Sequence, residues 1–176
     1  MTSIMFLRMP DRNQTADLWK GRAPSLLEEA YVAVLRTADE LQAAFSHFLK
    51  PYALSPTQYN ALRILRGAGE EGLACSKIGE RMINRDPDIT RLLDRMEARG
   101  LIARSRGKED RRKIFAYITR SGLLLLKKLD QPVEEFIGRL LDEIEESRLR
   151  SALGFLEELQ RNASAAVKKP IPSGTA

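Results

Sequence analysis

The sequence predicts a mainly α-helical protein with one small β-hairpin, and two observations support this prediction. Several long segments repeat apolar residues every three or four positions, which is the spacing of a helix that packs along one face. One interval, residues 101–118, instead holds two short runs of β-branched and aromatic residues on either side of a charged turn. At 176 residues, the chain suits a single domain with a core of its own.

The first predicted helix covers residues 25–49. Its apolar positions form a heptad-like stripe that can face a neighbouring helix or a second subunit: Leu27, Tyr31, Val34, Ala38, Leu41, Phe45 and Phe48. Pro51 ends this helix, because the residue before a proline disfavours the helical conformation. Residues 1–24 precede it as an arm without a long periodic pattern, and Trp19 is the residue by which that arm could dock.

The next helix has a strong start signal in LSPTQYNALRIL, residues 54–65. Ser55 is its predicted N-cap, Pro56 occupies the first helical position and Gln58 completes a capping box. The three glycines of GAGEEG, residues 67–72, then interrupt the helical pattern.

Two further helices are expected in the middle of the chain. A short one covers residues 75–83, and a longer one lies within NRDPDITRLLDRMEARG, residues 84–100. Asp86 is the predicted N-cap of the longer helix, with Pro87 at its first position and Gly100 at its end. The resulting order is a short helix, a tight turn and a longer helix.

The longer helix has two different faces. Its apolar face consists of Ile89, Leu92, Leu93 and Met96, whereas the opposite face presents Asp88, Arg91 and Arg95 together with nearby Thr90. The apolar face is expected to anchor the helix, which leaves the charged face available to a partner.

A β-hairpin is predicted directly after this helix. LIARSR at residues 101–106 and KIFAYI at residues 113–118 are typical of short strands, and GKEDRRK at residues 107–113 forms the tip. A run of charge is most often a solvated turn. Here it follows an arginine-bearing helix, so it is a candidate contact surface instead.

A second long helix is expected from Thr119, bent at Pro132, and a final helix near residues 148–161. Their apolar faces comprise Leu123, Leu126, Val133, Ile137, Leu140 and Ile144 on the first, and Leu149, Leu153, Leu156 and Leu159 on the second. The segment ASAAVKKPIPSGTA, residues 163–176, is interpreted as a frayed tail, with residues 166–176 flexible.

The positive charge of the chain lies in its middle third. The net charge is +5, but residues 74–120 alone contain 13 Lys/Arg and 7 Asp/Glu, whereas the flanking segments are close to neutral. Such a distribution indicates a surface that binds a polyanion.

Several classes of protein are disfavoured. Cys75 is the single cysteine and His47 the single histidine, so the chain cannot form an intramolecular disulfide or a thiolate zinc site, and most acid–base constellations are excluded too. GAGEEG lacks the Gly-Lys-Ser/Thr of a phosphate-binding loop, and we therefore expect no enzyme, cofactor or metal. No segment approaches the roughly 20 apolar residues that span a bilayer, which predicts a cytoplasmic protein with no membrane partner.

The order of these elements is that of a winged helix-turn-helix, residues 54–118, with further helical segments on either side at residues 25–53 and 119–165. A helix about 10–12 Å across fits the major groove of B-DNA, and a narrow hairpin can approach the adjacent minor groove or the phosphates.

The sequence resembles the MarR family of bacterial transcription regulators over about residues 25–165. The matching stretches are LSPTQYNALRIL, SKIGERM, DPDITRLLDRMEARGLIARSR and EDRRKIFAYIT. Two positions depart from the family pattern, because Ala74 replaces a frequent Thr or Ser cap and Gly79 replaces a usual alanine. These departures suggest a softer first helix of the motif.

The resemblance implies a homodimer, with residues 25–53 and 119–165 as its helical dimerisation region, that reads a pseudo-palindromic operator in double-stranded DNA and responds to a small anionic or phenolic effector. Because a dimer bound across promoter half-sites blocks polymerase, we expect it to act as a repressor. It implies that Asp88, Thr90 and Arg91 lie at base edges or nearby phosphates and that Arg95 holds the DNA backbone. In the wing it places Arg112 at the minor groove or its phosphates, with Asp110 orienting the guanidinium. The remaining predicted DNA-binding residues are Arg85, Arg106, Lys108 and Arg111.

Two alternatives remain open from the residues. A winged-helix adaptor that binds a partner protein is the main competitor, although the basic middle segment argues against it. Cys75, at a predicted helix start, could have a lowered pKa and sense oxidants; a structural role is favoured.

Overall fold

The computed structural model describes residues 23, 25–83, 88–107 and 110–168. Five residues singled out in the sequence lie outside the described residues: Trp19, Arg85, Asp86, Pro87 and Lys108. The elements run in the order α1 (Leu26–Leu49), η2 (Lys50–Tyr52), α2 (Pro56–Ala68), η3 (Gly69–Glu71), β1 (Leu73–Ala74), α3 (Cys75–Arg81), α4 (Ile89–Ala98), β2 (Ile102–Arg106), β3 (Ile114–Ile118), α5 (Arg120–Leu141) and α6 (Glu146–Lys168).

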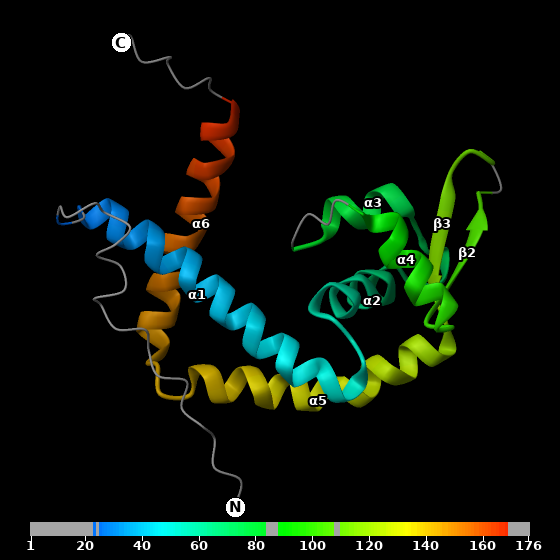
Figure 1. The fold of residues 1–176 in the computed structure, drawn as a ribbon, viewed down its shortest axis with the longest axis horizontal. Coiled ribbons are helices and arrows are strands. Elements are labelled where there is room, and N and C mark those ends of the chain that lie inside the picture. Colours follow the sequence, from blue (N-terminus) through cyan, green and yellow to red (C-terminus); the bar gives the residue numbers. More distant parts are fainter. Residues whose placement is uncertain (1–22, 24, 84–87, 108–109, 169–176) are drawn as a thin grey trace, which may run out of the picture.

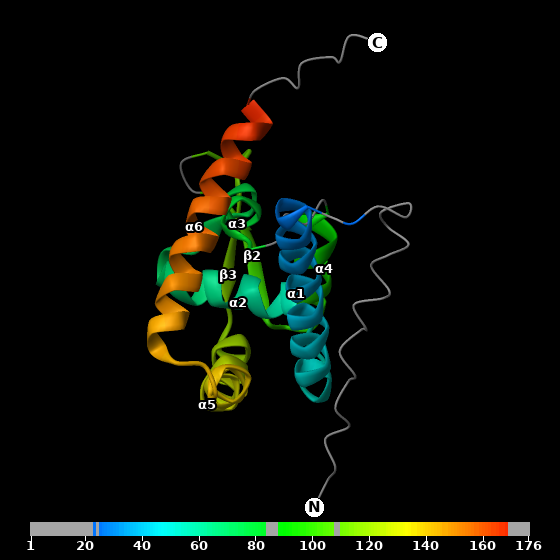
Figure 2. The same ribbon diagram turned by 90° about the vertical axis from the view of Figure 1, so that its left-hand side faces the viewer.

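The helices and strands divide between two ends of the molecule. Helices α2, α3 and α4 form one lobe with the strands, while the N-terminal part of α1 and all of α6 lie at the other end, and α5 runs along both (Figure 1). Helices α1 and α6 cross in this view but stand apart when the molecule is turned by 90° (Figure 2), so they do not pack on each other there. Among the helices that the structure describes, none has the length and apolar character needed to cross a membrane.

The predicted starts of α1 and α2 are confirmed. Ser55 caps α2, since its Oγ accepts from the Gln58 N–H at 3.1 Å and Gln58 Oε1 accepts from the Ser55 N–H at 3.1 Å. Ser25 and Glu28 form the same reciprocal pair at the start of α1. Local sequence therefore determines where both helices begin.

The predicted start of α4 is wrong by two residues. The helix begins at Ile89, and its N-cap is Asp88, whose Oδ1 accepts from the Arg91 N–H at 3.1 Å. The short helix α3 also ends earlier than predicted, at Arg81, because Met82 is extended and its side chain enters the core.

The C-terminal helix is longer than predicted, because residues 163–168 of the predicted tail are helical, whereas residues 169–176 lie outside the described residues. Helix α6 extends from Glu146 to Lys168, and therefore includes residues 163–168. Three of these six residues are alanines, the residue with the highest intrinsic helix propensity, which explains why the helix continues.

The predicted hairpin is confirmed to within one residue at each strand. Strands β2 and β3 are antiparallel, with Ile102 opposite Ile118, Arg104 opposite Ala116 and Arg106 opposite Ile114. Strand β1, not predicted, adds a third strand on the other side of β3. Its two residues are too few to show the alternation that marks a strand in a sequence.

The core lies within the lobe. As predicted, Leu92, Leu93 and Met96 of α4 are buried, and they join buried residues from α2, the sheet and the first half of α5: Leu62, Leu65, Ile102, Ala116, Leu126 and Leu129. The apolar stripes of the other helices remain exposed to a large extent, with Leu27 81% and Leu153 60% accessible. Of the predicted face of α5, Leu126 and Val133 are buried, whereas the rest is partly exposed.

Thr119 joins the hairpin to α5 and to the end of α4. Its N–H donates to the Leu101 carbonyl oxygen at 3.1 Å, and its hydroxyl donates to the Gly100 carbonyl oxygen at 2.7 Å. The same hydroxyl oxygen accepts from the Gly122 N–H at 3.1 Å and so caps α5. The end of α4, the wing and the start of α5 are thus fixed to one another.

Candidate nucleic-acid interface

Helix α4 presents its cations to solvent. Thr90, Arg91 and Arg95 are exposed, and the Arg91 side chain is 81% accessible. The buried apolar face of the helix holds it against the core, so these side chains project from a rigid element. This arrangement agrees with the two-faced helix expected from the sequence.

Asp88 is engaged within its own helix turn. Its Oδ1 caps the Arg91 N–H at 3.1 Å, and its Oδ2 lies 3.0 Å from Arg91 Nε. The carboxylate therefore anchors the helix start and orients the Arg91 guanidinium, a role that the sequence interpretation had not given to it.

The two other acids of α4 bind a residue that the sequence interpretation missed. Arg104 of β2 donates from Nε to Glu97 Oε2 at 2.9 Å and from Nη2 to the same oxygen at 2.6 Å. Its Nη2 also donates to Asp94 Oδ1 at 2.6 Å. Both acids of α4 are therefore paired with the wing strand β2.

A sequence signal for Arg104 does exist. Side chains two residues apart share one face of a strand, so Arg104 lies on the same face as the buried Ile102. An arginine on that face, next to a helix with acids spaced by three residues, is placed to pair with them.

The cluster shifts the pKa values of its members. The hydrogen bonds from Arg104 hold the pKa of Glu97 below its ordinary value, and the same bonds raise the pKa of Arg104. Because the charged carboxylate is the favoured form, Glu97 contributes stability above its unfolded pKa of about 4.3.

Glu97→Gln is accordingly expected to lower the free energy of unfolding at pH 7. The deficit should shrink as the pH falls from about 4.3 through the lower pKa of the folded protein, where the native carboxylate is protonated too. Denaturant unfolding of both proteins across this range measures the difference. Glu70→Gln, at an exposed acid of η3, is the control and should show no such convergence. A constant deficit for Glu97→Gln would contradict the assignment.

The hairpin tip is closed by backbone and side-chain bonds. The Gly107 N–H donates to the Lys113 carbonyl oxygen at 2.8 Å, and the Lys113 N–H donates to the Asp110 carbonyl oxygen at 3.1 Å. Asp110 Oδ1 accepts from the backbone N–H of Arg112 at 3.0 Å. The expectation that Asp110 holds the Arg112 guanidinium is therefore corrected, because this carboxylate shapes the turn and leaves the guanidinium exposed.

The predicted residues thus fall into two groups on neighbouring elements. Asp88, Thr90, Arg91 and Arg95 lie on α4, whereas Arg106, Asp110, Arg111 and Arg112 lie at the hairpin, and α4 packs against β2. In the described part of the hairpin, Arg106, Arg111 and Arg112 are all exposed.

Comparison with known proteins decides what this arrangement belongs to. A model of the MarR family matches residues 54–114, which extend from α2 to the start of β3. The HTH-type transcriptional regulator TtmR of Methylorubrum extorquens is 31% identical over 137 residues, which cover 76% of this chain and 69% of TtmR. The chain belongs to the MarR family. The expected winged-helix fold is confirmed, and membership of a family of transcription regulators supports the expectation that the chain is not an enzyme.

Solved structures of MarR regulators have the same fold. A crystal structure of a MarR transcription factor from Planctomyces limnophilus is 39% identical, with a TM-score of 0.60, and covers 77% of this chain and 98% of that protein. The structure of Bordetella bronchiseptica BpsR is 19% identical, with a TM-score of 0.67, and covers 76% of this chain and 99% of BpsR. The latter likeness is one of fold alone.

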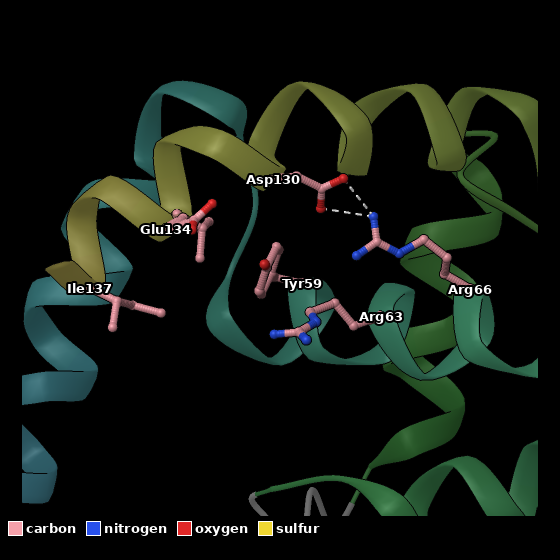
Figure 3. Close-up of a pocket in the computed structure, with 7 residues that line it drawn as sticks. Tyr59, Arg63, Arg66, Asp130, Glu134 and Ile137 are labelled. Carbon is pink, nitrogen blue, oxygen red and sulfur yellow. Dashed lines mark hydrogen bonds and ion pairs between the residues drawn. The ribbon is translucent and has the colours of Figure 1, made fainter. Parts of the chain in front are cut away.

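Two adjoining cavities lie between the winged helix and the long helices of this MarR protein. The smaller, of about 270 Å³, is lined by residues of α2 and α5, and Arg66 Nη1 closes one side by binding both oxygens of Asp130 at 2.8 and 2.9 Å (Figure 3). The larger, of about 750 Å³, lies between α1, α2, α5 and the end of α3, and it shares Tyr59, Arg63, Val133 and Ile137 with the smaller one.

The larger cavity is rich in aromatic rings. Phe45 packs edge-on against Tyr59 with ring centroids 5.3 Å apart, and it lies 5.8 Å from Phe136. Arg63 stands 6.0 Å from the centre of the Tyr59 ring, and Arg81 is a second cation of the lining. The cavity therefore combines flat apolar walls with positive charge.

The pKa of the Cys75 thiol in this MarR chain is raised and not lowered, so its surroundings agree with the structural role that the sequence favoured. Burial raises the pKa of its thiol, an effect that outweighs the nearby Arg104 charge. Cys75 is half-buried at the start of α3, where it packs against the core. Among the residues described, no group of His, Cys, Asp and Glu is arranged to hold a metal ion.

Proposed function

We propose that this MarR-family protein binds double-stranded operator DNA as a homodimer and represses transcription. The observation that carries the proposal is that α4 and the adjacent hairpin tip both present exposed arginines. The acids of α4 are meanwhile bound to Arg104. A dimer that covers promoter half-sites blocks polymerase by occupancy, which is the simplest route to repression.

The exposed apolar stripes support a dimer. The surfaces of α1 and α6 include exposed large side chains: Leu26, Leu27, Tyr31, Leu35, Leu153 and Phe155. Large apolar side chains exposed along two long helices are typical of helices that pack against a partner chain. We assign residues 25–53 and the chain from 119 to the end of α6 to dimerisation, and residues 54–118 to DNA binding. The two-fold axis of a homodimer implies a pseudo-palindromic operator.

Each group of residues has its own part in this proposal. Arg91 and Thr90 reach base edges in the major groove, where an arginine can donate two bonds to guanine, and Arg95 holds the adjacent phosphates. At the wing, Arg112 approaches the minor groove and Arg106 and Arg111 its phosphates. Arg85 and Lys108, which lie outside the described residues, are proposed as further DNA contacts from their sequence positions, and Asp88 acts by orienting Arg91.

Selection from a pool of random duplexes tests the proposal. The enriched sequences should form a pseudo-palindrome with half-sites about 34–36 Å apart, one turn of B-DNA, and native mass spectrometry should show two chains on each duplex. Failure to enrich any motif would contradict operator binding and direct attention to a protein partner. A single chain on each duplex would contradict the dimer.

The same proposal includes a small effector, aromatic and anionic or phenolic, in the larger cavity. The rings of Phe45, Tyr59 and Phe136 can stack on a flat ligand, and Arg63 can bind its negative charge. In BpsR, which shares this fold, DNA binding is regulated by 6-hydroxynicotinic acid. Because α5 is fixed to α4 by Thr119, a ligand between α2 and α5 is placed to change the spacing of the two α4 helices.

Hydroxybenzoates and phenols are therefore expected to raise the melting temperature and weaken DNA binding. At about 100 times its Kd, such a ligand would stabilise the folded protein by about 2.7 kcal/mol. Arg63→Gln should raise the hydroxybenzoate concentration needed for a given effect about tenfold. The concentration of a neutral phenol needed for the same effect should remain nearly unchanged. If no compound of either class changes melting temperature or DNA affinity, the effector part of the proposal is wrong.

A further inference from the structure

The exposed side of α4 poses an electrostatic problem for a DNA-binding helix. Arg91 and Arg95 share this helix with Asp94 and Glu97, whose side chains are 52% and 38% accessible. Carboxylates that close to a phosphate backbone would repel it. Something must therefore hold these two acids and offset their charge.

Arg104 meets both requirements from the wing strand. Its guanidinium binds Asp94 and Glu97 at 2.6 Å each, and its own backbone N–H donates to Glu97 Oε1 at 3.0 Å. The acid at position 97 is thereby bound to both the side chain and the main chain of β2. A wing strand held in this way cannot rotate relative to α4 without breaking charge-assisted hydrogen bonds.

We propose that Arg104 is a positioning residue for DNA binding, which fixes the wing to α4 and neutralises the acids of that helix without contacting DNA itself. This inference rests on the proposed function. The Arg104 side chain is 21% accessible and its Nε and Nη2 donors are engaged, whereas Arg106, two residues along the same strand, is exposed. The two arginines should thus affect DNA binding in different ways.

The first test uses the protein without DNA. In the unmodified protein, carboxyl NMR should show Glu97 titrating below its ordinary pKa, and Arg104→Met should return that pKa toward the ordinary value. Arg106→Met is the matched control, with the same chemical change on the same strand, and should leave the Glu97 titration unchanged. An Arg104→Met protein whose Glu97 titrates as before would overturn the clamp.

The second test measures DNA affinity against salt with the selected operator. Arg104→Met should weaken binding on the order of tenfold, which corresponds to about 1.4 kcal/mol, with the salt slope unchanged. Arg106→Met should reduce the slope by about 0.9, the value for one lost phosphate contact. Combining Arg104→Met with Asp94→Asn and Glu97→Gln should recover part of the lost affinity, because the uncompensated acids are gone.

The outcomes that contradict the positioning role differ from the outcome that contradicts the proposed function. A slope reduced by about 0.9 in Arg104→Met, with no recovery in the triple variant, would make Arg104 a phosphate contact and overturn the proposal. So would an unchanged affinity. If Arg104→Met does not fold, Arg104→Lys replaces it, because lysine keeps the charge but lacks the planar guanidinium that binds two acids. This variant should bind DNA more weakly with an unchanged salt slope. Binding equal to that of the unmodified chain would overturn the positioning role. Absence of binding by the unmodified chain would instead contradict the proposed function.

Discussion

Gly122→Ala is expected to lower the free energy of unfolding by about 2 kcal/mol or more. Gly122 lies in the first turn of α5, and a Cβ there would overlap the Leu101 carbonyl oxygen and lie 2.8 Å from Ile118 Cγ1. The oxygen cannot withdraw easily, because it accepts the Thr119 N–H at 3.1 Å. Overpacking of this kind typically costs about 1–3 kcal/mol, and here it also strains the junction between α4, the wing and α5.

Gly138→Ala, in the same helix, is the matched control. A Cβ at position 138 meets no atom within 4 Å, so the substitution should stabilise the helix by about 0.5–1 kcal/mol. Denaturant unfolding of both variants gives the comparison. Equal effects of the two substitutions, or a stabilised Gly122→Ala protein, would contradict the close approach of α5 to the end of α4.

Arg91→Ala and Arg112→Ala are expected to weaken DNA binding in two distinguishable ways. Loss of Arg91, which is oriented by Asp88 at the start of α4, should reduce discrimination between operator and random DNA by about 1–3 kcal/mol. Loss of Arg112, whose backbone is held by Asp110 and whose side chain is exposed, should weaken binding to both duplexes and flatten the salt dependence.

Lys127→Ala serves as the control for these two changes. Lys127 is an exposed cation of α5, outside the proposed interface, so its removal should alter neither discrimination nor salt slope by a comparable amount. Fluorescence-anisotropy titrations at several salt concentrations measure both quantities. If Arg91→Ala and Arg112→Ala both bind as the unmodified chain does, the assignment of these residues to DNA contacts is wrong.

Local signals explain what the sequence predicted well. The capping box at Ser55 and Gln58, the apolar face of α4 and the two strands of the hairpin are all confirmed. Each depends on residues close together in the chain, where capping and periodicity act directly. The family resemblance rests on the same stretches, which is why it is confirmed by the match to residues 54–114.

The errors arose where a choice depended on distant partners. Asp86 and Asp88 are both suitable N-caps by residue type. The helix begins at Ile89, and its apolar face, Leu92, Leu93 and Met96, is buried in the core. Arg104, the partner of Asp94 and Glu97, was missed because it lies on a neighbouring strand.

The measurement that tests operator recognition most directly is a fluorescence-anisotropy titration of the DNA beside the protein's own gene. A scrambled duplex of equal length is titrated in parallel, across a range of salt concentrations. The proposed interface predicts tight, salt-sensitive binding to the duplex from beside the gene. Its affinity should exceed that for the scrambled duplex by a factor of about 10³ or more. Equal and weak binding to that duplex, to the scrambled duplex and to any selected duplex would contradict sequence-specific recognition by α4 and the wing.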